Sequence, residues 1–66
     1  MNIILNGSPR DVPDNLTAGG LIVELGLTHK RLALEVNQQI VPRSTFETHL
    51  IRPEDNIEIV QAIGGG

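Results

Sequence analysis

Residues 57–62 read Ile-Glu-Ile-Val-Gln-Ala and continue directly into Ile63-Gly64-Gly65-Gly66. β-branched residues at this density are typical of strands. The apolar residues fall on both faces of the alternation, which indicates a strand central in its sheet. The apolar run at residues 2–6 has the same character. We therefore predict that these two strands form the central pair of a sheet, and that a parallel arrangement carries the glycines out at one end.

The chain after the first strand predicts a hairpin. Asn6-Gly7 favours a tight turn because both residues tolerate positive φ. The returning strand is expected to be short, around residues 10–12. It is also expected at the edge of the sheet, since Pro9 and Pro13 each lack an amide donor.

One helix is predicted after Thr17, whose side chain can cap its N-terminus. Apolar residues follow at the helical spacing i, i+3, i+4 and i+7. They are Ala18, Leu21, Ile22 and Leu25. Gly26 is placed to end the helix in the left-handed conformation. Gly19 and Gly20 each cost up to about 1 kcal/mol relative to alanine, so packing on the sheet must hold the helix, and the order of its first turn stays open.

The second half of the chain predicts a second hairpin and a loop. Residues 32–36 alternate between apolar and other side chains, as in a half-buried strand. After a turn at residues 37–39, residues 40–41 are expected to pair back antiparallel until Pro42 withholds a donor. A polar stretch then carries Phe46, which is the single aromatic residue and the expected anchor of the loop.

The predicted order is strand, strand, helix, strand, short strand, strand. A right-handed crossover places the helix over one face of the sheet. The fold class is therefore α+β, a ubiquitin-like β-grasp with a mixed four- to five-stranded sheet and one main helix packed across one face. We assign the β-grasp domain to residues 1–62 and a flexible glycine tail to residues 63–66. Partners are expected to dock on the open face of the sheet, through a patch with a hydrophobic centre.

Composition narrows the function classes. A chain of 66 residues without cysteine is expected to form one domain that has neither disulfides nor thiolate metal sites. The net charge of −3 and five scattered basic residues argue against a nucleic-acid partner. The pattern of a signal peptide is missing, and no apolar run approaches the roughly 20 residues of a membrane span. We therefore expect a cytoplasmic protein without a membrane partner.

The glycine tail is the strongest candidate for chemistry. Residues 63–66 reach roughly 13 Å when extended, at about 3.3 Å per residue. Because Gly64 and Gly65 have no Cβ, this thread is as thin as the backbone and can carry the α-carboxylate of Gly66 into a narrow channel. Ile63 is either a plug at the channel mouth or, as we favour, the end of the last strand. The alternative for the whole tail is a frayed terminus without function.

The other polar residues give weaker indications of a functional site than the glycine tail does. His29 and His49 are far apart in a chain without thiolates, so surface loops are favoured over a metal site. Glu54 and Asp55 are adjacent in a predicted turn, where Asp is selected for bonding to the backbone, which argues against a general acid/base pair. Arg43 has two interpretations, a salt bridge within the domain or a contact with a partner.

Several features together resemble one protein family. They are residues 36–43 (Val-Asn-Gln-Gln-Ile-Val-Pro-Arg), Phe46, Asp55, residues 57–59 (Ile-Glu-Ile) and the terminal residues 63–66. In this order and in so short a chain they resemble the ThiS family of sulfur carrier proteins of thiamine biosynthesis. The resemblance covers nearly the whole chain and is weakest between residues 8 and 28. Gly19-Gly20 departs from it, because relatives more often carry better helix formers there.

The resemblance implies a protein that is modified and does not itself catalyse. In this family a ubiquitin-activating-like adenylyltransferase (ThiF-type) uses ATP to adenylate the C-terminal glycine, here Gly66. Sulfur that originates from a cysteine desulfurase then converts it to a thiocarboxylate, which donates the sulfur to a thiazole synthase (ThiG-type). Gly64 and Gly65 would enter both partners, and Ile63 and Arg43 are possible contacts. No cofactor is expected on this chain, because ATP is bound by the partner.

Two other interpretations stay open. The same tail chemistry serves carriers for molybdopterin synthesis and for tRNA thiolation, although the short chain and residues 37–43 favour the thiazole pathway. A ubiquitin-like interaction module with an inert tail is the alternative from a different class. The intact mass of the protein from its own cells separates the inert module from a carrier, because only a carrier replaces a terminal oxygen with sulfur.

Overall fold

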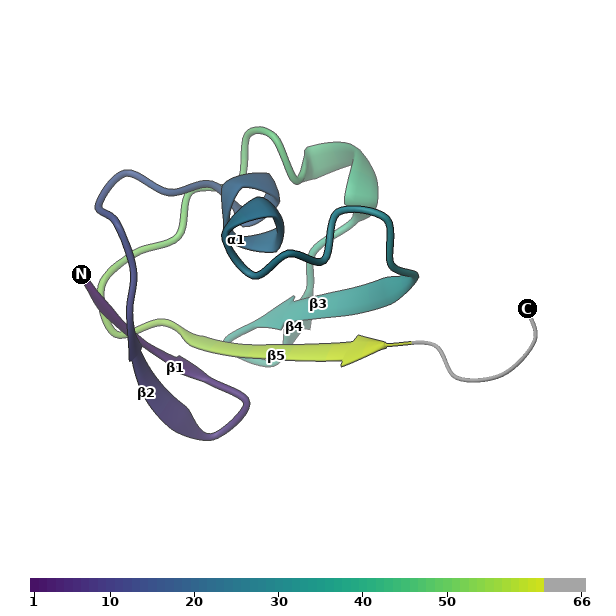
Figure 1. Cartoon of the computed structure of the whole chain (residues 1–66). Helices are drawn as coiled ribbons and strands as arrows, with labels where there is room; N and C mark the ends of the chain where they lie inside the picture. Colours follow the sequence, from purple (N-terminus) through teal and green to yellow (C-terminus); the bar gives the residue numbers. More distant parts are fainter. Residues whose placement is uncertain (62–66) are drawn as a thin grey trace.

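The computed structural model describes residues 1–61 and shows a sheet crossed on one face by a helix (Figure 1). In chain order the elements are β1 (Asn2–Leu5), β2 (Ser8–Asp11), α1 (Ala18–Glu24), β3 (Leu32–Val36), β4 (Gln39–Ile40), the 3-10 helix η1 (Arg43–Thr45) and β5 (Asn56–Gln61). This is the predicted order. No helix among the described residues is long and apolar enough to cross a membrane.

The five strands of the sheet lie in the order β2-β1-β5-β3-β4. β1 and β5 are parallel neighbours near its centre, whereas the other neighbouring pairs are antiparallel. The predicted mixed sheet with a parallel central pair is therefore confirmed. The first and last strands of the described chain lie side by side, as a β-grasp requires.

The boundaries of β2 differ from the prediction. The strand covers Ser8–Asp11, not the region around residues 10–12, and Pro9 lies inside it opposite Ile4. An edge strand tolerates proline because one side of it needs no donors. Val12 has left the strand and is buried, and its amide donates to the carbonyl of Met1 at 2.8 Å.

Both hairpins turn through two residues with positive φ. Asn6-Gly7 has φ values of 49° and 84°, and Asn37-Gln38 has values of 51° and 70°. This is the pattern of type I′ turns, whose twist matches that of the strands. The second turn is one residue shorter than the predicted turn at residues 37–39, because Gln39 already belongs to β4.

The core lies between the sheet and α1. The largest fully buried side chains come from both layers and are Ile3, Leu21, Leu34 and Ile57. Phe46 packs against this core from the segment after η1, so its predicted role as an anchor is confirmed. Figure 1 shows α1 and η1 on the same side of the sheet, which leaves the other face open.

Hydrogen bonds from the amides of Ala18, Gly19 and Gly20 hold the first turn of α1. The amide of Gly20 donates to the Thr17 side chain at 3.0 Å, so the predicted cap is confirmed. The amide of Gly19 donates to the carbonyl of Phe46 at 2.9 Å. An added Cβ would lie 3.4 Å from that oxygen at Gly19, but 2.9 Å from Leu16 Cδ1 at Gly20. A Cβ at Gly19 would therefore make an ordinary contact, whereas a Cβ at Gly20 would displace the end of the Leu16 side chain.

These distances distinguish the two glycines. We expect Gly19→Ala to raise the free energy of unfolding by up to about 1 kcal/mol, through the higher helix propensity of alanine. Gly20→Ala is expected to gain less, because the side chain of Leu16 must move. Urea unfolding of both variants beside the wild type measures the difference. A Gly20→Ala variant that is the more stable of the two would contradict this account.

Candidate functional site

The predicted tail lies beyond the described part of the chain. Ile63, Gly64, Gly65 and Gly66 all fall outside residues 1–61, and so does Ala62 at the predicted end of the last strand. The structure therefore defines the site up to Gln61. What the structure shows of the site is how the fold positions β5, the strand that leads toward the glycines.

β5 leads to the tail with unequal support on its two sides. It pairs with β3 over five positions, and the last of these joins Gln61 to Leu32. Its parallel pairing with β1 covers only two positions and ends at Leu5 opposite Ile57. The second half of β5 therefore extends past the β1–β2 hairpin, along β3 (Figure 1).

Two asparagine side chains hold β5 where strand pairing is missing. Asn6 Oδ1 accepts a hydrogen bond from the amide of Ile59 at 2.9 Å. Asn37 Oδ1 accepts one from the amide of Asn56 at 3.0 Å. Each asparagine is the first residue of a hairpin turn, so one turn residue from each flanking hairpin bonds to the backbone of β5. Sequence analysis predicted the turns but missed these bonds.

Asp55 has the structural role that the turn predicts. Its Oδ2 accepts a hydrogen bond from the amide of Arg52 at 2.8 Å, and its Oδ1 accepts one from Asn37 Nδ2 at 3.1 Å. Glu54 beside it has a φ of 67° in the turn. The carboxylate of Asp55 thus bonds within the turn that precedes β5 and connects this turn to Asn37.

Arg43 lies exposed at the start of η1. Its guanidinium carbon is 5.9 Å from the centre of the Phe46 ring, within the range of a cation–π contact. Within residues 1–61 it forms no salt bridge, because the ion pairs found there all involve the Met1 ammonium. Of the two interpretations of Arg43, the salt bridge is therefore not found in this part of the chain, and a partner contact stays a prediction.

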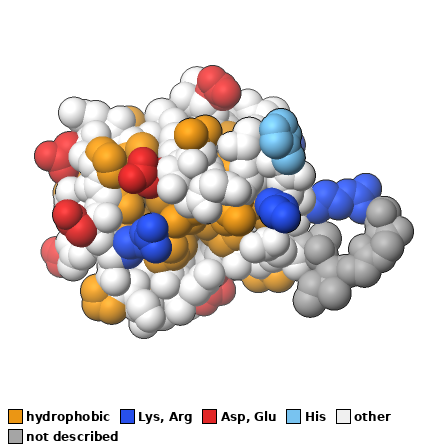
Figure 2. Space-filling view, in the orientation of Figure 1, with side chains coloured by type: hydrophobic (Ala, Val, Ile, Leu, Met, Phe, Trp, Pro, Cys, Tyr) orange, Lys and Arg blue, Asp and Glu red, His pale blue; other side chains and the backbone are white. Residues whose placement is uncertain are grey.

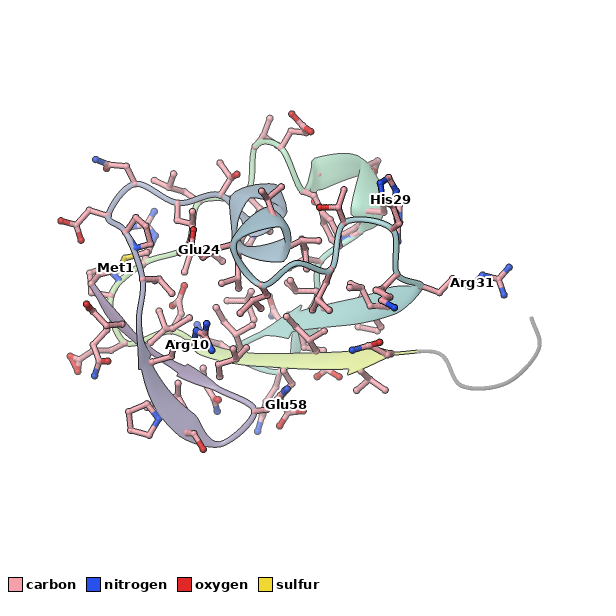
Figure 3. All side chains as sticks on the ribbon, viewed as in Figure 1. Met1, Arg10, Glu24, His29, Arg31 and Glu58 are labelled. Atoms are coloured by element: carbon pink, nitrogen blue, oxygen red, sulfur yellow. The ribbon has the colours of Figure 1, made fainter. Side chains whose placement is uncertain are left out.

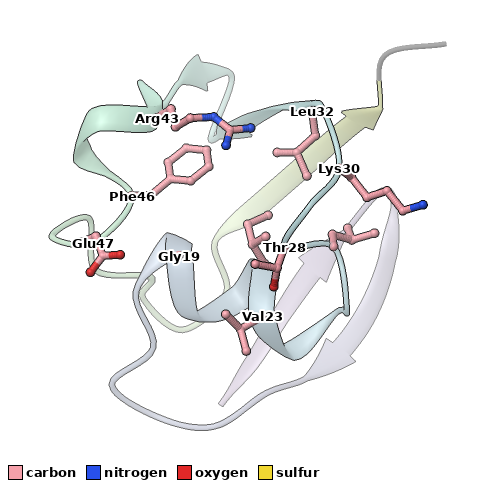
Figure 4. Close-up of a pocket in the computed structure, with 10 residues that line it drawn as sticks. Gly19, Val23, Thr28, Lys30, Leu32, Arg43, Phe46 and Glu47 are labelled. Carbon is pink, nitrogen blue, oxygen red and sulfur yellow. The ribbon is translucent and has the colours of Figure 1, made fainter. Parts of the chain in front are cut away.

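Arg43 and Phe46 also border a hollow of about 230 Å³ between α1, the loop after it and η1 (Figure 4). Sequence analysis missed this feature. Val23 at its edge is 65% exposed. The sequence held one signal for the hollow, because Val23 is apolar but lies outside the predicted apolar stripe of the helix. A single exposed valine is nevertheless common on protein surfaces.

The open face of the sheet differs from the prediction of a patch with a hydrophobic centre. Because Leu34 and Ile57 are buried under the helix, alternation places Glu35 and Glu58 on the open face, where they are cross-strand partners. Figure 3 shows Glu58 on the side away from α1. The middle of this face is therefore acidic, and the expected hydrophobic centre is wrong.

Apolar residues flank this acidic pair. Val60 is 60% exposed beside Ala33, and Ile40, 71% exposed, lies opposite Glu35. Ile4 is half-buried and pairs with β2. The open face thus combines exposed aliphatic side chains with two carboxylates.

The histidines do not come together with other metal ligands. Among residues 1–61 no group of three His, Cys, Asp or Glu side chains is placed to hold a metal ion. His29 lies in an exposed loop after α1 (Figure 3). His49 donates its backbone amide to Thr45, and its carbonyl accepts the amide of Ala18. The backbone of His49 therefore connects its loop to the start of the helix.

The arrangement of strands and helix identifies the class of protein. A mixed sheet of five strands, with a parallel central pair and one helix across one face, is the ubiquitin-like β-grasp fold. The crystal structure of a thiamine biosynthesis protein (ThiS) from Geobacter metallireducens shares this fold. Its TM-score is 0.86 at 26% sequence identity, and the match covers 100% of both chains.

The sequence then assigns the family. The ThiS family profile matches residues 3–66, and the chain belongs to the ThiS family. It is 33% identical to the sulfur carrier protein ThiS of Escherichia coli (strain K12) over 66 residues, which cover the whole of both chains. It is 38% identical over 66 residues to a thiazole synthase of Magnetococcus marinus, of which it covers 20%. The chain spans about a fifth of the length of the curated thiazole synthases it matches.

The bond from Asn6 to β5 can be tested directly. Asn6→Gly keeps the positive φ but removes the acceptor, so we expect a loss of about 0.5–1.5 kcal/mol in the free energy of unfolding. Amide hydrogen exchange of Ile59 should accelerate more than that of Ile57, whose strand pairing is unchanged. Asn6→Asp is the control, because it keeps an acceptor oxygen and tolerates positive φ. Unchanged exchange at Ile59 in Asn6→Gly would show that this bond does not support the strand.

Proposed function

We propose that this protein is a sulfur carrier of thiamine biosynthesis, and that Gly66 is adenylated and then converted to a thiocarboxylate. The observation that carries this proposal is the match to the Escherichia coli sulfur carrier protein ThiS over the full length of both chains. The structure supports it through β5, a strand bonded on both sides that leads directly to the glycines. The chain acts as a protein co-substrate and not as an enzyme.

The chemistry follows from the properties of the terminal group. A carboxylate is a poor acyl electrophile until one of its oxygens becomes part of a leaving group. Attack of the Gly66 carboxylate on the α-phosphate of ATP releases pyrophosphate and gives such an acyl adenylate. The terminal sulfur of a partner's persulfide then displaces AMP and gives an acyl disulfide. A second thiolate, also from outside this chain, attacks the other sulfur of that bond, which releases the Gly66 thiocarboxylate and leaves a disulfide on the donor. Because the chain has no cysteine, this sulfur must come from another protein.

The proposed partners follow from these steps. A ThiF-type adenylyltransferase binds ATP, a cysteine desulfurase supplies sulfur indirectly, and a ThiG-type thiazole synthase receives it, all in the cytoplasm. Segments similar to this whole chain occur within proteins named thiazole synthase, which supports the last partner. The names of the relatives favour the thiamine pathway over molybdopterin synthesis or tRNA thiolation.

The glycine thread gives the first functional prediction. Deleting Gly66, or adding one residue after it, should abolish thiocarboxylate formation, because the terminal carboxylate then lies one residue short of, or one residue beyond, its position in the adenylating site. The free energy of unfolding should change by less than about 0.5 kcal/mol, as for surface changes generally. Intact mass spectrometry after incubation with the adenylyltransferase, ATP and a persulfide donor detects the replacement of oxygen by sulfur. Normal sulfur loading of either variant would refute the carrier proposal.

The open face gives the second prediction. We expect Val60→Ser and Ile40→Ser to weaken binding to the adenylyltransferase by about 1 kcal/mol or more each, as interface anchors do. Leu50→Ser is the matched control, because Leu50 is 50% exposed but belongs to no strand of the sheet. Titration calorimetry with each variant measures the affinity. Equal losses in all three variants would show that the open face has no special part in docking.

A further inference from the structure

The hollow beside η1 is the feature that the proposed function leaves unexplained. Its apolar lining comes from α1, the loop after it, β3 and the segment after η1: Ile22, Val23, Leu27, Leu32 and Phe46. Its volume of about 230 Å³ is below the roughly 300–1,000 Å³ of typical small-molecule sites. The size therefore fits an inserted side chain better than a cofactor.

The rim of the hollow is charged unevenly. Lys30 and Arg43 lie on either side of Leu32, whereas Glu47 lies on the opposite rim beyond Phe46 (Figure 4). Both cations are exposed, and within residues 1–61 neither has a carboxylate within 4.0 Å. An unpaired cation pair beside an apolar hollow is complementary to an apolar side chain that has carboxylates next to it.

The overall charge makes this end of the molecule distinctive. The chain has a net charge of −3 and only five basic residues. Lys30 and Arg43 line the hollow, and Arg31 follows Lys30 in the chain. In Figure 3, Arg31 lies at the end of the molecule where β5 ends, whereas Arg10 lies toward the other end, where acidic side chains gather in Figure 2. Three of the five basic residues, Lys30, Arg31 and Arg43, thus lie at or beside the hollow near the end of β5.

The hollow is also tied to the tail by strand pairing. Leu32 lines it and is the partner of Gln61, the last residue of β5. A protein that encloses the residues after Gln61 must therefore lie close to Leu32, Lys30 and Arg43. The hollow and the tail are placed to be covered by the same partner.

We propose that this hollow docks an acidic segment of the adenylyltransferase: a large apolar side chain enters between Val23 and Phe46, and neighbouring carboxylates pair with Lys30 and Arg43. This inference rests on the proposed carrier function. The segment lies with its acidic end toward Leu32 and away from Glu47. Docking there fixes the rotation of the domain about β5, so that the glycine thread enters its channel in one orientation.

Charge reversal tests the inference. Arg43→Glu and Lys30→Glu should each raise the KM for the carrier in adenylyltransferase-dependent ATP–pyrophosphate exchange by about 10-fold or more, with kcat nearly unchanged, because electrostatic contacts act mainly on association. The matched control is Arg10→Glu, the same charge change on β2 at the far edge of the sheet, with an expected change in KM of less than about 2-fold. Urea unfolding confirms that each variant is folded.

Two further variants test which rim of the hollow binds the acidic end of the segment. Glu47→Gln removes the one carboxylate on the rim and should lower KM. Arg43→Gln should weaken docking without repelling the partner, so its KM should fall between those of wild type and Arg43→Glu. The effect of Arg43→Glu should shrink as salt rises toward 1 M, where the screening length falls to about 3 Å.

The outcomes separate the two proposals. If the wild-type chain supports no exchange at all, the proposed function fails. If the wild type is active and Arg43→Glu and Lys30→Glu behave like Arg10→Glu, the docking inference is overturned while the carrier function stands. A higher KM for Glu47→Gln would likewise overturn the assigned polarity of the docked segment.

Discussion

The position of β5 between β1 and β3 is the constraint on which the rest of the structure depends. Its parallel pairing with β1 covers two positions, whereas its pairing with β3 covers five. A strand fixed on one side only is free to twist away from the sheet at its end. The side chain of Asn6 limits this, because its oxygen holds the amide of Ile59 at 2.9 Å after β1 has turned into the hairpin. The direction in which the tail leaves therefore depends on a turn residue as well as on the strands.

The helix, like the end of β5, is held in place by a small number of contacts. α1 has seven residues, fewer than the roughly 12–15 that an isolated helix needs to be stable in water. Burial of Leu21 and Ile22 holds it on the sheet, and the amide of Gly19 bonds to the carbonyl of Phe46. The glycine that lowers helix propensity thus joins the helix to the segment after η1. The walls of the hollow are consequently fixed relative to one another.

The elements that sequence analysis predicted are those with a local physical signal. Alternation predicted β3 and its buried side, and the Thr17 cap and Gly26 predicted the ends of the helix, because capping and positive φ act within a few residues. The boundaries of β2 were wrong because proline at an edge strand breaks no ladder bond. The bonds from Asn6 and Asn37 to β5, and the hollow, join residues that are distant in the chain, so no local pattern predicts them. The central acidic pair was missed for a different reason: Glu35 and Glu58 were each read within their own strand, and only the register between β3 and β5 brings them together.

The two surfaces of the domain differ in charge, and this has a consequence for a carrier with a single tail. The open face carries Glu35 and Glu58, while the other side, at the end of β5, carries Lys30 and Arg43. An acidic segment suits the side with Lys30 and Arg43 and is repelled by the open face, so a partner that contacts both sides must present a different surface to each. Both sides meet at the last two pairs of β5 and β3, where Val60 faces one way and Leu32 the other. Because one tail can occupy only one channel, partners that hold it exclude each other even when they dock on opposite sides. Exchange between them therefore requires full release of the carrier, and exposed charge pairs that are individually worth about 0–1 kcal/mol suit an interaction that must be released.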